Sequence, residues 1–226
     1  MCGRFTQSFT WAEVHAFLDV LGAPRNLEPR YNIAPTDTID VAAIGKEGDR
    51  KLVPMRWGLI PSWWKKPLKE LPATFNARRE SVAEKPMFRD AYRQRRCIIP
   101  MSGFYEWIAT PDGKQPFFIS GAEHSVLGVA GLWDRWCDAT GDWVITATMI
   151  VQPANDFLGR IHTRMPTFVD RGDVDGWLSG ATGLDVLKPA SEELLIARPV
   201  SKRVNRVGNT EDASLVEPVP AENVLP

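Results

Sequence analysis

From residue 97 onward the chain alternates short runs of apolar, β-branched and aromatic residues with residues that form turns. The runs cover 97–100, 103–109, 115–120, 125–134 and 143–151. They are separated by Pro111-Asp112-Gly113, by Gly121 and by Ala139-Thr140-Gly141-Asp142. These are turn compositions, because glycine, proline and aspartate accept the backbone angles that turns need. The pattern predicts a mostly antiparallel sheet as the framework of the fold.

The first half of the chain begins with a clear helix signal. Thr10 followed by Glu13 has the pattern of a capping box, apolar residues then recur at helical spacing, and Gly22 is a typical helix stop. We therefore expect a helix over 11–21. Further expected elements are strands at 38–44, 51–60 and 167–169 and helices at 86–95, 154–159, 173–178 and 191–196.

No internal repeat, low-complexity tract or shift in composition divides the 226 residues. We therefore expect one α+β domain over residues 1–226, built on a mostly antiparallel, barrel-like β-sheet core with a few peripheral helices. Residues 207–226 are acidic and contain proline, which predicts either an extended edge or a loose C-terminal tail.

Composition excludes several classes of protein. Hydrophobic residues make up 44% of the chain and charged residues 24%, which rules out disordered, collagen-like and coiled-coil proteins. No run approaches the ~20 apolar residues of a membrane span, and residues 1–25 lack a signal-peptide pattern. The three cysteines form no CxxC pair, so neither a disulfide framework nor a zinc site is indicated. We expect a protein of the reducing cytoplasm with no membrane partner.

The overall charge of −1 conceals a basic segment. Residues 51–106 contain 12 Lys or Arg against 5 Asp or Glu, interleaved with aromatic residues such as Trp63, Trp64 and Phe75. Cations follow a phosphate backbone, and aromatic faces stack on unpaired bases, so this mixture is compatible with nucleic-acid binding. A solvated helix face near 86–96 together with core aromatics is the alternative.

The cysteine at position 2 could have a reactivity that no other residue of the chain has. The initiator Met is normally removed when the next residue is small, and Cys2 would then carry an α-amine and a thiol on adjacent carbons. Both groups titrate at about pH 8, so both retain nucleophilic fractions at neutral pH. Such a pair converts an aldehyde to a Schiff base and then to a five-membered thiazolidine. The alternatives are attack of the sulfur on an acyl group and an inert buried thiol.

Two further residues have catalytic potential. Glu106 lies within a strand-like run, where a partly desolvated carboxylate has a raised pKa that suits proton transfer near pH 7. An outward-facing strand residue is the alternative. His162 lies in a predicted loop before Pro166, a position typical of catalytic imidazoles, although it could equally be a packed loop residue. The three histidines have no metal-ligand spacing, and no glycine-rich phosphate loop is present.

Several motifs occur together in a fixed order. They are Met1-Cys2-Gly3-Arg4-Phe5, Arg30-Tyr31-Asn32-Ile33-Ala34-Pro35, Trp57-Gly58-Leu59-Ile60-Pro61-Ser62-Trp63-Trp64, Asn76-Ala77-Arg78-Arg79-Glu80, Gly103-Phe104-Tyr105-Glu106-Trp107 and Ile161-His162-Thr163-Arg164-Met165-Pro166. With these motifs the chain resembles the SOS response-associated peptidase (SRAP) family, the abasic-site processing proteins, from residue 2 to about residue 220.

The resemblance implies a covalent reaction with damaged DNA. Members bind single-stranded DNA that carries an abasic site and join Cys2 to the ring-opened sugar aldehyde through a thiazolidine. By the same resemblance Asn76 orients the sugar or the Cys2 backbone. Glu106 assists proton transfer during ring opening and imine formation, and His162 handles protons at the sugar oxygen.

The resemblance also implies how the DNA is held. Arg4, Arg78 and Arg164 would bind phosphates beside the lesion, and Trp63 and Trp64 would form an aromatic wedge against the neighbouring bases. It implies no cofactor and no metal. We expect a monomer, because a single self-consuming reaction needs one copy, and a cytoplasmic location with association to the nucleoid when DNA is bound.

Two other functions remain open at the level of sequence. The chain could be a cysteine peptidase with Cys2 as acyl nucleophile and Glu106 or His162 as base. The simplest version of this activity is removal of its own Met1. It could also be a non-covalent reader of modified DNA bases that uses its tryptophans and arginines without chemistry.

Overall fold

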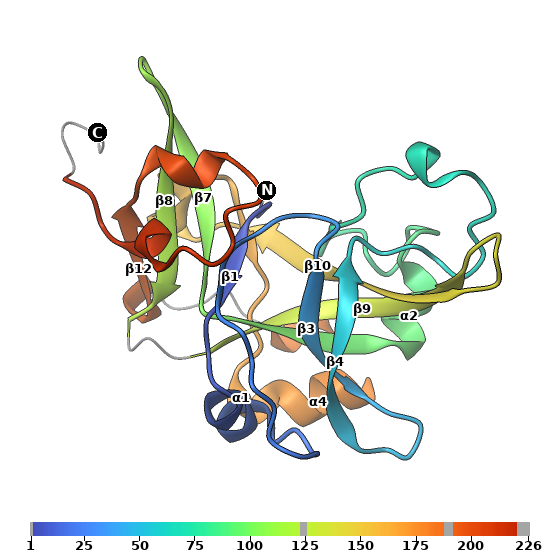
Figure 1. Cartoon of the computed structure of the whole chain (residues 1–226). Coiled ribbons are helices and arrows are strands. Elements are labelled where there is room, and N and C mark those ends of the chain that lie inside the picture. The colour runs from blue at the N-terminus through green and yellow to red at the C-terminus, as the bar shows by residue number, and fades with distance from the viewer. Residues whose placement is uncertain (1, 123–125, 188–191, 221–226) are drawn as a thin grey trace.

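The structure is a computed structural model that describes residues 2–122, 126–187 and 192–220. Its main features are two β-sheets that lie side by side, with short helices around them (Figure 1).

Five strands close into a barrel. They are β3 (Thr38–Ile44), β4 (Arg50–Trp57), β6 (Arg96–Met101), β9 (Leu127–Cys137) and β10 (Trp143–Pro153). Four of the contacts between neighbours are antiparallel, and a parallel contact of β10 with β4, where Thr146 faces Arg56, completes the ring. Two short strands, β5 (Asn76–Arg78) and β11 (Arg164–Pro166), pair with the second half of β10. The predicted barrel-like, mostly antiparallel core is confirmed.

The second sheet is antiparallel throughout. In spatial order it consists of β12 (Leu195–Pro199), β8 (Gly113–Gly121), β7 (Gly103–Thr110), β1 (Phe5–Gln7) and β2 (Arg30–Ile33). Gly103 is required by close packing between β7 and β8, since a Cβ atom there would lie 2.4 Å from the Phe118 ring and 2.6 Å from the Ile119 carbonyl oxygen. The sheet places β1, and with it the N-terminal segment, next to β7.

The helices are short. The α-helices are α1 (Trp11–Leu18), α2 (Arg89–Gln94), α3 (Asp156–Gly159) and α4 (Val174–Ser179). The 3-10 helices are η1 (Leu68–Glu70), η2 (Arg171–Asp173), η3 (Leu184–Val186), η4 (Glu192–Leu194), η5 (Lys202–Asn205) and η6 (Ala213–Val216). Leu18 of α1 and Trp177 of α4 belong to one buried cluster with Ile98 of the barrel, so these helices cover the outside of the barrel. None of the helices in the described ranges has the length and apolar character to cross a membrane.

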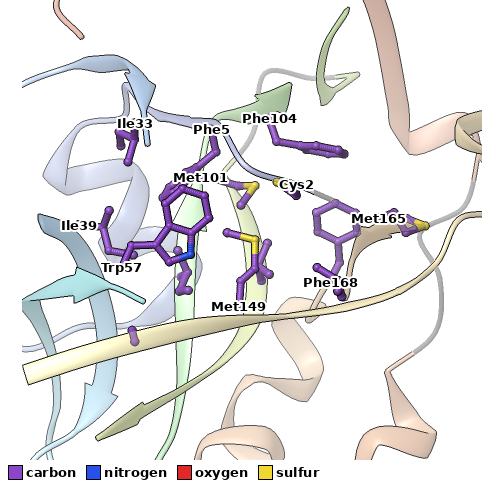
Figure 2. Packing of buried hydrophobic residues seen from close by; sticks show 14 of the residues in the cluster. Cys2, Phe5, Ile33, Ile39, Trp57, Met101, Phe104, Met149, Met165 and Phe168 are labelled. Atoms are coloured by element: carbon purple, nitrogen blue, oxygen red, sulfur yellow. The ribbon is translucent and has the colours of Figure 1, made fainter. Parts of the chain in front are cut away.

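The main core lies between the barrel and the second sheet. Figure 2 shows Cys2, Phe5, Trp57 and Met149 among the buried side chains of this cluster. The Phe5 and Trp57 rings meet edge to face, with centroids 4.9 Å apart and planes at 88°, a favourable arrangement for aromatic pairs. The beginning of the chain is therefore packed in the centre of the molecule.

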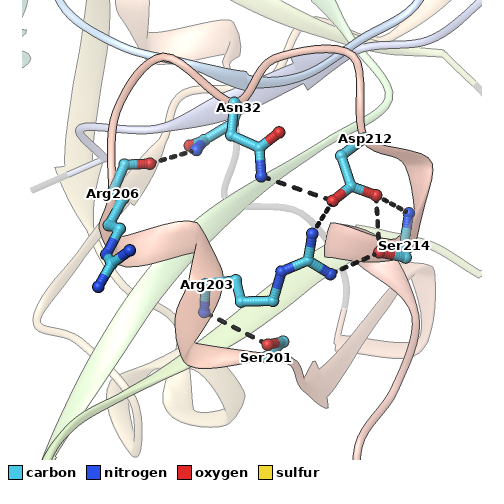
Figure 3. Close-up of polar contacts among 7 residues, drawn as sticks. Asn32, Ser201, Arg203, Arg206, Asp212 and Ser214 are labelled. Carbon is cyan, nitrogen blue, oxygen red and sulfur yellow. Dashed lines mark hydrogen bonds and ion pairs between the residues drawn. The ribbon is translucent and has the colours of Figure 1, made fainter.

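The segment that follows β12 crosses the outer face of the second sheet. Leu215 of η6 packs in a small buried cluster with Tyr105 of β7. Figure 3 shows the polar contacts that hold this segment: Arg203 forms an ion pair with Asp212, and the side-chain amide of Asn32 donates to the Arg206 carbonyl oxygen at 2.8 Å. Residues 213–216 form η6 and are no loose tail, and the expected extended edge is limited to the antiparallel bridge of Pro218 with Val200.

Several sequence-based boundaries need correction. The capping box of Thr10 and Glu13 is confirmed, but α1 ends at Leu18, because Asp19 adopts a left-handed conformation (φ 51°) and closes the helix before Gly22. The helix expected over 191–196 is wrong for residues 195–196, which belong to β12 and pair with β8. The strand expected over 167–169 is reduced to one bridge between Phe168 and Val129.

Other predicted elements are confirmed with shifted ends, including the strands after residue 97, α3 and α4. The helix expected over 86–95 is shorter, because α2 covers Arg89–Gln94. Position 125 of one predicted strand, position 191 of one predicted helix and the terminal 221–226 of the predicted tail lie outside the described residues.

Candidate active site around Cys2

Cys2 is fully buried, three residues before the first residue of β1. Its Sγ lies 3.8 Å from the Arg4 carbonyl oxygen, which accepts a weak hydrogen bond from the thiol. Burial raises the pKa of the Cys2 thiol well above its ordinary value, and the negative charge of Glu106 raises it further. The resting sulfur is therefore a neutral thiol that needs a base before it can attack.

Asn76 is directly bonded to the backbone of Cys2. Its Nδ2 donates to the Cys2 carbonyl oxygen at 2.7 Å. The Oδ1 of the same amide is buried and has no hydrogen-bond partner among the described residues. The amide therefore holds Cys2 with its donor and retains an acceptor for a group that enters the site.

Asn76 is itself held in place through the preceding residue. The Phe75 carbonyl oxygen accepts hydrogen bonds from the Trp57 indole N–H at 2.9 Å and from the Met149 backbone N–H at 3.1 Å. Trp57 also contacts the Phe5 and Phe75 rings edge to face. One indole thus links β1, β4 and β5. Sequence reasoning assigned Trp57 no role of its own, although it is the first residue of the motif Trp57-Gly58-Leu59-Ile60-Pro61-Ser62-Trp63-Trp64, and that position is a signal that could have identified it.

Glu106 faces the inner layer between the two sheets. Along β7 it lies on the same side as Phe104, which belongs to the main core, while Tyr105 lies on the opposite side and packs against the C-terminal segment. Burial raises the pKa of Glu106 to about 7. The carboxyl group can therefore either donate or accept a proton at neutral pH.

His162 completes the group. It follows α3, and its Nδ1 lies 3.9 Å from the Glu106 Oε1. The same Nδ1 lies 3.0 Å from the Arg164 backbone nitrogen and 3.3 Å from the Arg164 carbonyl oxygen, so the Arg164 backbone holds the ring in either tautomer of the neutral imidazole. Burial lowers the pKa of His162. The imidazole is therefore predominantly neutral at pH 7 and can accept a proton.

The three predicted arginines have different surroundings. Arg78 is exposed on β5, two residues beyond Asn76 on the same face of the strand. Arg164 on β11 forms an ion pair with Glu80. Arg4 uses its Nη1 for two internal hydrogen bonds, to Asn32 Oδ1 at 2.7 Å and to the Val204 carbonyl oxygen at 2.8 Å. Arg78 and Arg164 both lie beside the second half of β10.

Trp63 and Trp64 are neighbours with unequal exposure. Their ring centroids are 6.0 Å apart, but Trp63 is 46% exposed and Trp64 only 8%. The Trp64 carbonyl oxygen also accepts a hydrogen bond from the Trp136 indole at 2.8 Å. The Trp63 ring is therefore accessible to a ligand, and the buried Trp64 ring packs beside it.

The four predicted catalytic residues thus come from four separate segments. Asn76 contacts the backbone of Cys2, the charge of Glu106 acts on the Cys2 thiol, and His162 lies beside Glu106. Across the described residues, no three His, Cys, Asp or Glu side chains are grouped so that they could hold a metal ion.

Together, the fold and the site define an α+β protein with a cysteine-centred site between a β-barrel and an antiparallel sheet. The chain belongs to the family described as SOS response associated peptidase (SRAP), whose model matches residues 1–207.

The chain is similar over most of its length to proteins of this family. It is 34% identical over 217 residues to the abasic site processing protein YoaM of Bacillus subtilis, covering 92% of this chain and 95% of that protein. It is 32% identical over 234 residues to the abasic site processing protein YedK of Escherichia coli, covering 97% and 100%. A solved structure from Bacteroides thetaiotaomicron has the same fold, with a TM-score of 0.85, 23% identity, and coverage of 97% of this chain and 100% of that one.

Proposed function

We propose that this protein recognises abasic sites in single-stranded DNA and cross-links to them. The bond is a thiazolidine between Cys2, after removal of Met1, and the ring-opened deoxyribose aldehyde. The names of the relatives support the abasic site as the target. The observation that carries the proposal is the placement of Cys2. Its carbonyl oxygen accepts a hydrogen bond from Asn76, and the negative charge of Glu106 raises the pKa of its thiol.

The reaction is a condensation that releases one water molecule. The α-amine of Cys2 adds to the C1′ aldehyde, and loss of water from the carbinolamine leaves an imine. The sulfur then adds to the imine carbon, the thiol proton passes to the imine nitrogen through a base, and the five-membered ring closes. No redox change occurs, and the chain's own groups are sufficient for every proton transfer.

Glu106 and His162 have the properties that these proton transfers require. A carboxyl group with a pKa near 7 can protonate the departing hydroxyl group in its acid form and accept the thiol proton in its charged form. A neutral imidazole can take up the proton of the C1′ hydroxyl group as the sugar ring opens, and the imidazolium can return it to the ring oxygen that leaves C1′. The division of roles follows from burial, which raises the carboxyl pKa and lowers the imidazole pKa.

The DNA contacts are part of the same proposal. Arg78 and Arg164, beside the second half of β10, would hold phosphates next to the lesion, and Trp63 would stack on a neighbouring base. Arg4 would add a phosphate contact through the guanidinium N–H groups that Asn32 and Val204 do not use. We propose that the protein acts as a monomer in the cytoplasm and associates with the nucleoid when bound to DNA.

The test is formation of an SDS-resistant adduct with an oligonucleotide that bears one abasic site. Wild type should form it, and Cys2→Ala should not, nor should a chain with an extra residue ahead of Cys2. Cys97→Ala is the matched control, because Cys97 is equally buried but lies within a barrel strand. Adduct formation by Cys2→Ala at the wild-type rate would refute the proposal. Intact mass, with or without one methionine residue, establishes whether Cys2 is free.

A peptidase activity is the second candidate. It is favoured by the family description and by the effect of the Glu106 charge on the pKa of the Cys2 thiol, since the carboxylate could activate sulfur for attack on an acyl group. Its simplest form is removal of Met1 by the chain itself. Glu106→Ala, produced in a host with normal aminopeptidase, should then retain Met1. Normal processing of this variant would exclude self-cleavage.

A further inference from the structure

An exposed aromatic surface lies at the end of the β9–β10 hairpin, away from Cys2. Trp143 is 62% exposed, more than Trp63, and the Arg135 guanidinium lies over its ring at 5.0 Å from the centroid. Trp143 faces Cys137 across the strands, and Arg135 faces Ile145, so these residues share one face of the hairpin. We call Trp133, Arg135 and Trp143 the hairpin platform.

The hairpin platform borders a hollow of about 340 Å³ that reaches toward the Trp63 segment. The hollow is lined by Ser62, Lys65, Arg95, Trp133, Asp134, Arg135, Cys137 and Trp143. Lys65 and Ser62 come from the same segment as Trp63, and a second hollow between Lys65, Lys66 and Trp136 lies against it. In Figure 1 the yellow turn between β9 and β10 lies beside the loop that follows β4. The surface is therefore continuous with the proposed DNA-binding residues.

The charges in this hollow favour an anionic partner. Its one acidic lining residue, Asp134, is neutralised by an ion pair with Arg95 at 3.2 Å and accepts a hydrogen bond from the Ser62 backbone N–H at 3.0 Å. Lys65 and Arg135 have no carboxylate partner among the described residues. The carboxylates of Asp138 and Asp142 in the nearby turn accept hydrogen bonds from Thr140. Two cations beside an exposed indole match a strand of phosphates and unpaired bases.

We propose that the hairpin platform binds the single strand that flanks the lesion, with a base stacked on Trp143 and phosphates on Arg135 and Lys65. This inference rests on the proposed function, because it assumes that DNA reaches Cys2. It assigns the protein a second, remote DNA contact that takes no part in the chemistry.

The strand geometry sets how far the DNA must extend. Trp143 and Met149 are six positions apart on β10, and Met149 lies opposite Asn76 of the site. At about 3.4 Å per residue this separation is roughly 20 Å. A stacked strand advances about 3.4 Å per nucleotide, so roughly six nucleotides span the same distance. A flank of two nucleotides is too short to reach the hairpin platform, and a flank of twelve passes it.

The experiment compares cross-linking rates at subsaturating protein on abasic oligonucleotides with flanks of two or twelve nucleotides. Long flanks are placed on both sides, on the 5′ side alone or on the 3′ side alone. Wild type should be faster when the long flank is on one particular side. On that long-flank DNA, Trp143→Ala should cross-link at least about five times more slowly than wild type, since about fivefold is the lower limit for the loss of one stacked base. On DNA with two short flanks the variant should match wild type. Leu21→Ala, which removes another exposed apolar side chain, is the control.

Arg135 supplies an independent readout. Arg135→Ala should lower the slope of log affinity against log salt concentration by about one on a long unmodified single strand, and Arg135→Glu should weaken binding further. Equal slowing on short and long DNA, or no change in either, would overturn the inference. An effect seen only when the flank is base-paired would make the partner a duplex and would also overturn it. If wild type forms no adduct at all, the proposed function fails, while binding to unmodified single strands still decides the role of Trp143.

Discussion

The side-chain amide of Asn76 donates a hydrogen bond to the main-chain carbonyl oxygen of Cys2 across 2.7 Å. The two residues are 74 positions apart in the sequence. The bond ties the start of the chain to β5, and β5 is in turn held by β10 of the barrel. The position of the candidate nucleophile is thus set by the barrel and not by local structure at the N-terminus.

This bond leads to the first prediction. Asn76→Ala should slow cross-linking about fivefold or more, because one hydrogen bond is worth about 1 kcal/mol and the Cys2 backbone would lose its anchor. Asn76→Asp should be no better, since a carboxylate cannot donate to the carbonyl. Single-turnover cross-linking at saturating DNA is the measurement. Full activity of both variants would show that Cys2 is positioned by packing alone.

The raised pKa of Glu106 predicts a dependence of stability on pH. The carboxyl has an ordinary pKa of 4.5 and a pKa of about 7 in the folded protein, so the folded state binds more protons between these values. Glu106 therefore weakens the fold as pH rises from 4.5 to 7. Glu106→Gln should be more stable than wild type at pH 8, by up to about 3 kcal/mol. This difference should shrink toward pH 4.5.

Denaturant unfolding of wild type and Glu106→Gln at several pH values measures this effect. The same variant should cross-link far more slowly, because the amide cannot exchange protons. A variant that is less stable than wild type at pH 8 would show that the carboxylate is held by favourable interactions, contrary to the effect of its burial.

Trp57 is predicted to be a positioning residue for Asn76. Trp57→Phe removes the indole N–H that holds the Phe75 carbonyl oxygen, and it should lower both the stability and the cross-linking rate. Trp177→Phe is a matched control, because Trp177 is equally buried and its indole donates to the Cys97 carbonyl oxygen at 2.9 Å in the other cluster. Each variant should lose roughly 1–3 kcal/mol of stability.

The two variants should differ in activity. Only Trp57→Phe should reduce the cross-linking rate at saturating DNA, measured at a temperature where both proteins are folded. Equal rates for the two variants would mean that Trp57 contributes to stability alone.

Substitutions of Trp63 and Trp64 should have different effects, one on DNA binding and the other on the stability of the fold. Trp63→Ala should weaken DNA binding about fivefold or more, because its exposed ring is available for stacking, and should leave the thermal midpoint nearly unchanged. Trp64→Ala should cost about 3 kcal/mol of stability, because its ring is buried. Fluorescence anisotropy with a labelled single strand and thermal unfolding test the pair. Loss of stability in Trp63→Ala without weaker binding would assign it to the core.

Some features of this protein could be predicted from the sequence alone. Alternating apolar runs and turn residues predicted the antiparallel sheet, since the side-chain period of a strand and the angles of a turn are local properties. The cap of α1 at Thr10 was predicted for the same reason. The reactive potential of Cys2 follows from its position in the chain, and the expected behaviour of Glu106 from an acidic residue in a strand-like run.

Other features were decided by tertiary structure. The end of α1 at Asp19 and the pairing of β12 with β8 override local propensity. The sequence could not show that Trp57 holds Phe75, or that Trp63 is exposed while Trp64 is buried. Burial and hydrogen bonds between distant segments arise only when the barrel and the second sheet close around a common core. The actual burial of Glu106 and His162, which raises the pKa of the first and lowers the pKa of the second, depends on that closure. The strand-like run around Glu106 allowed an outward-facing carboxylate as well as a buried one, and only the tertiary structure decided between them.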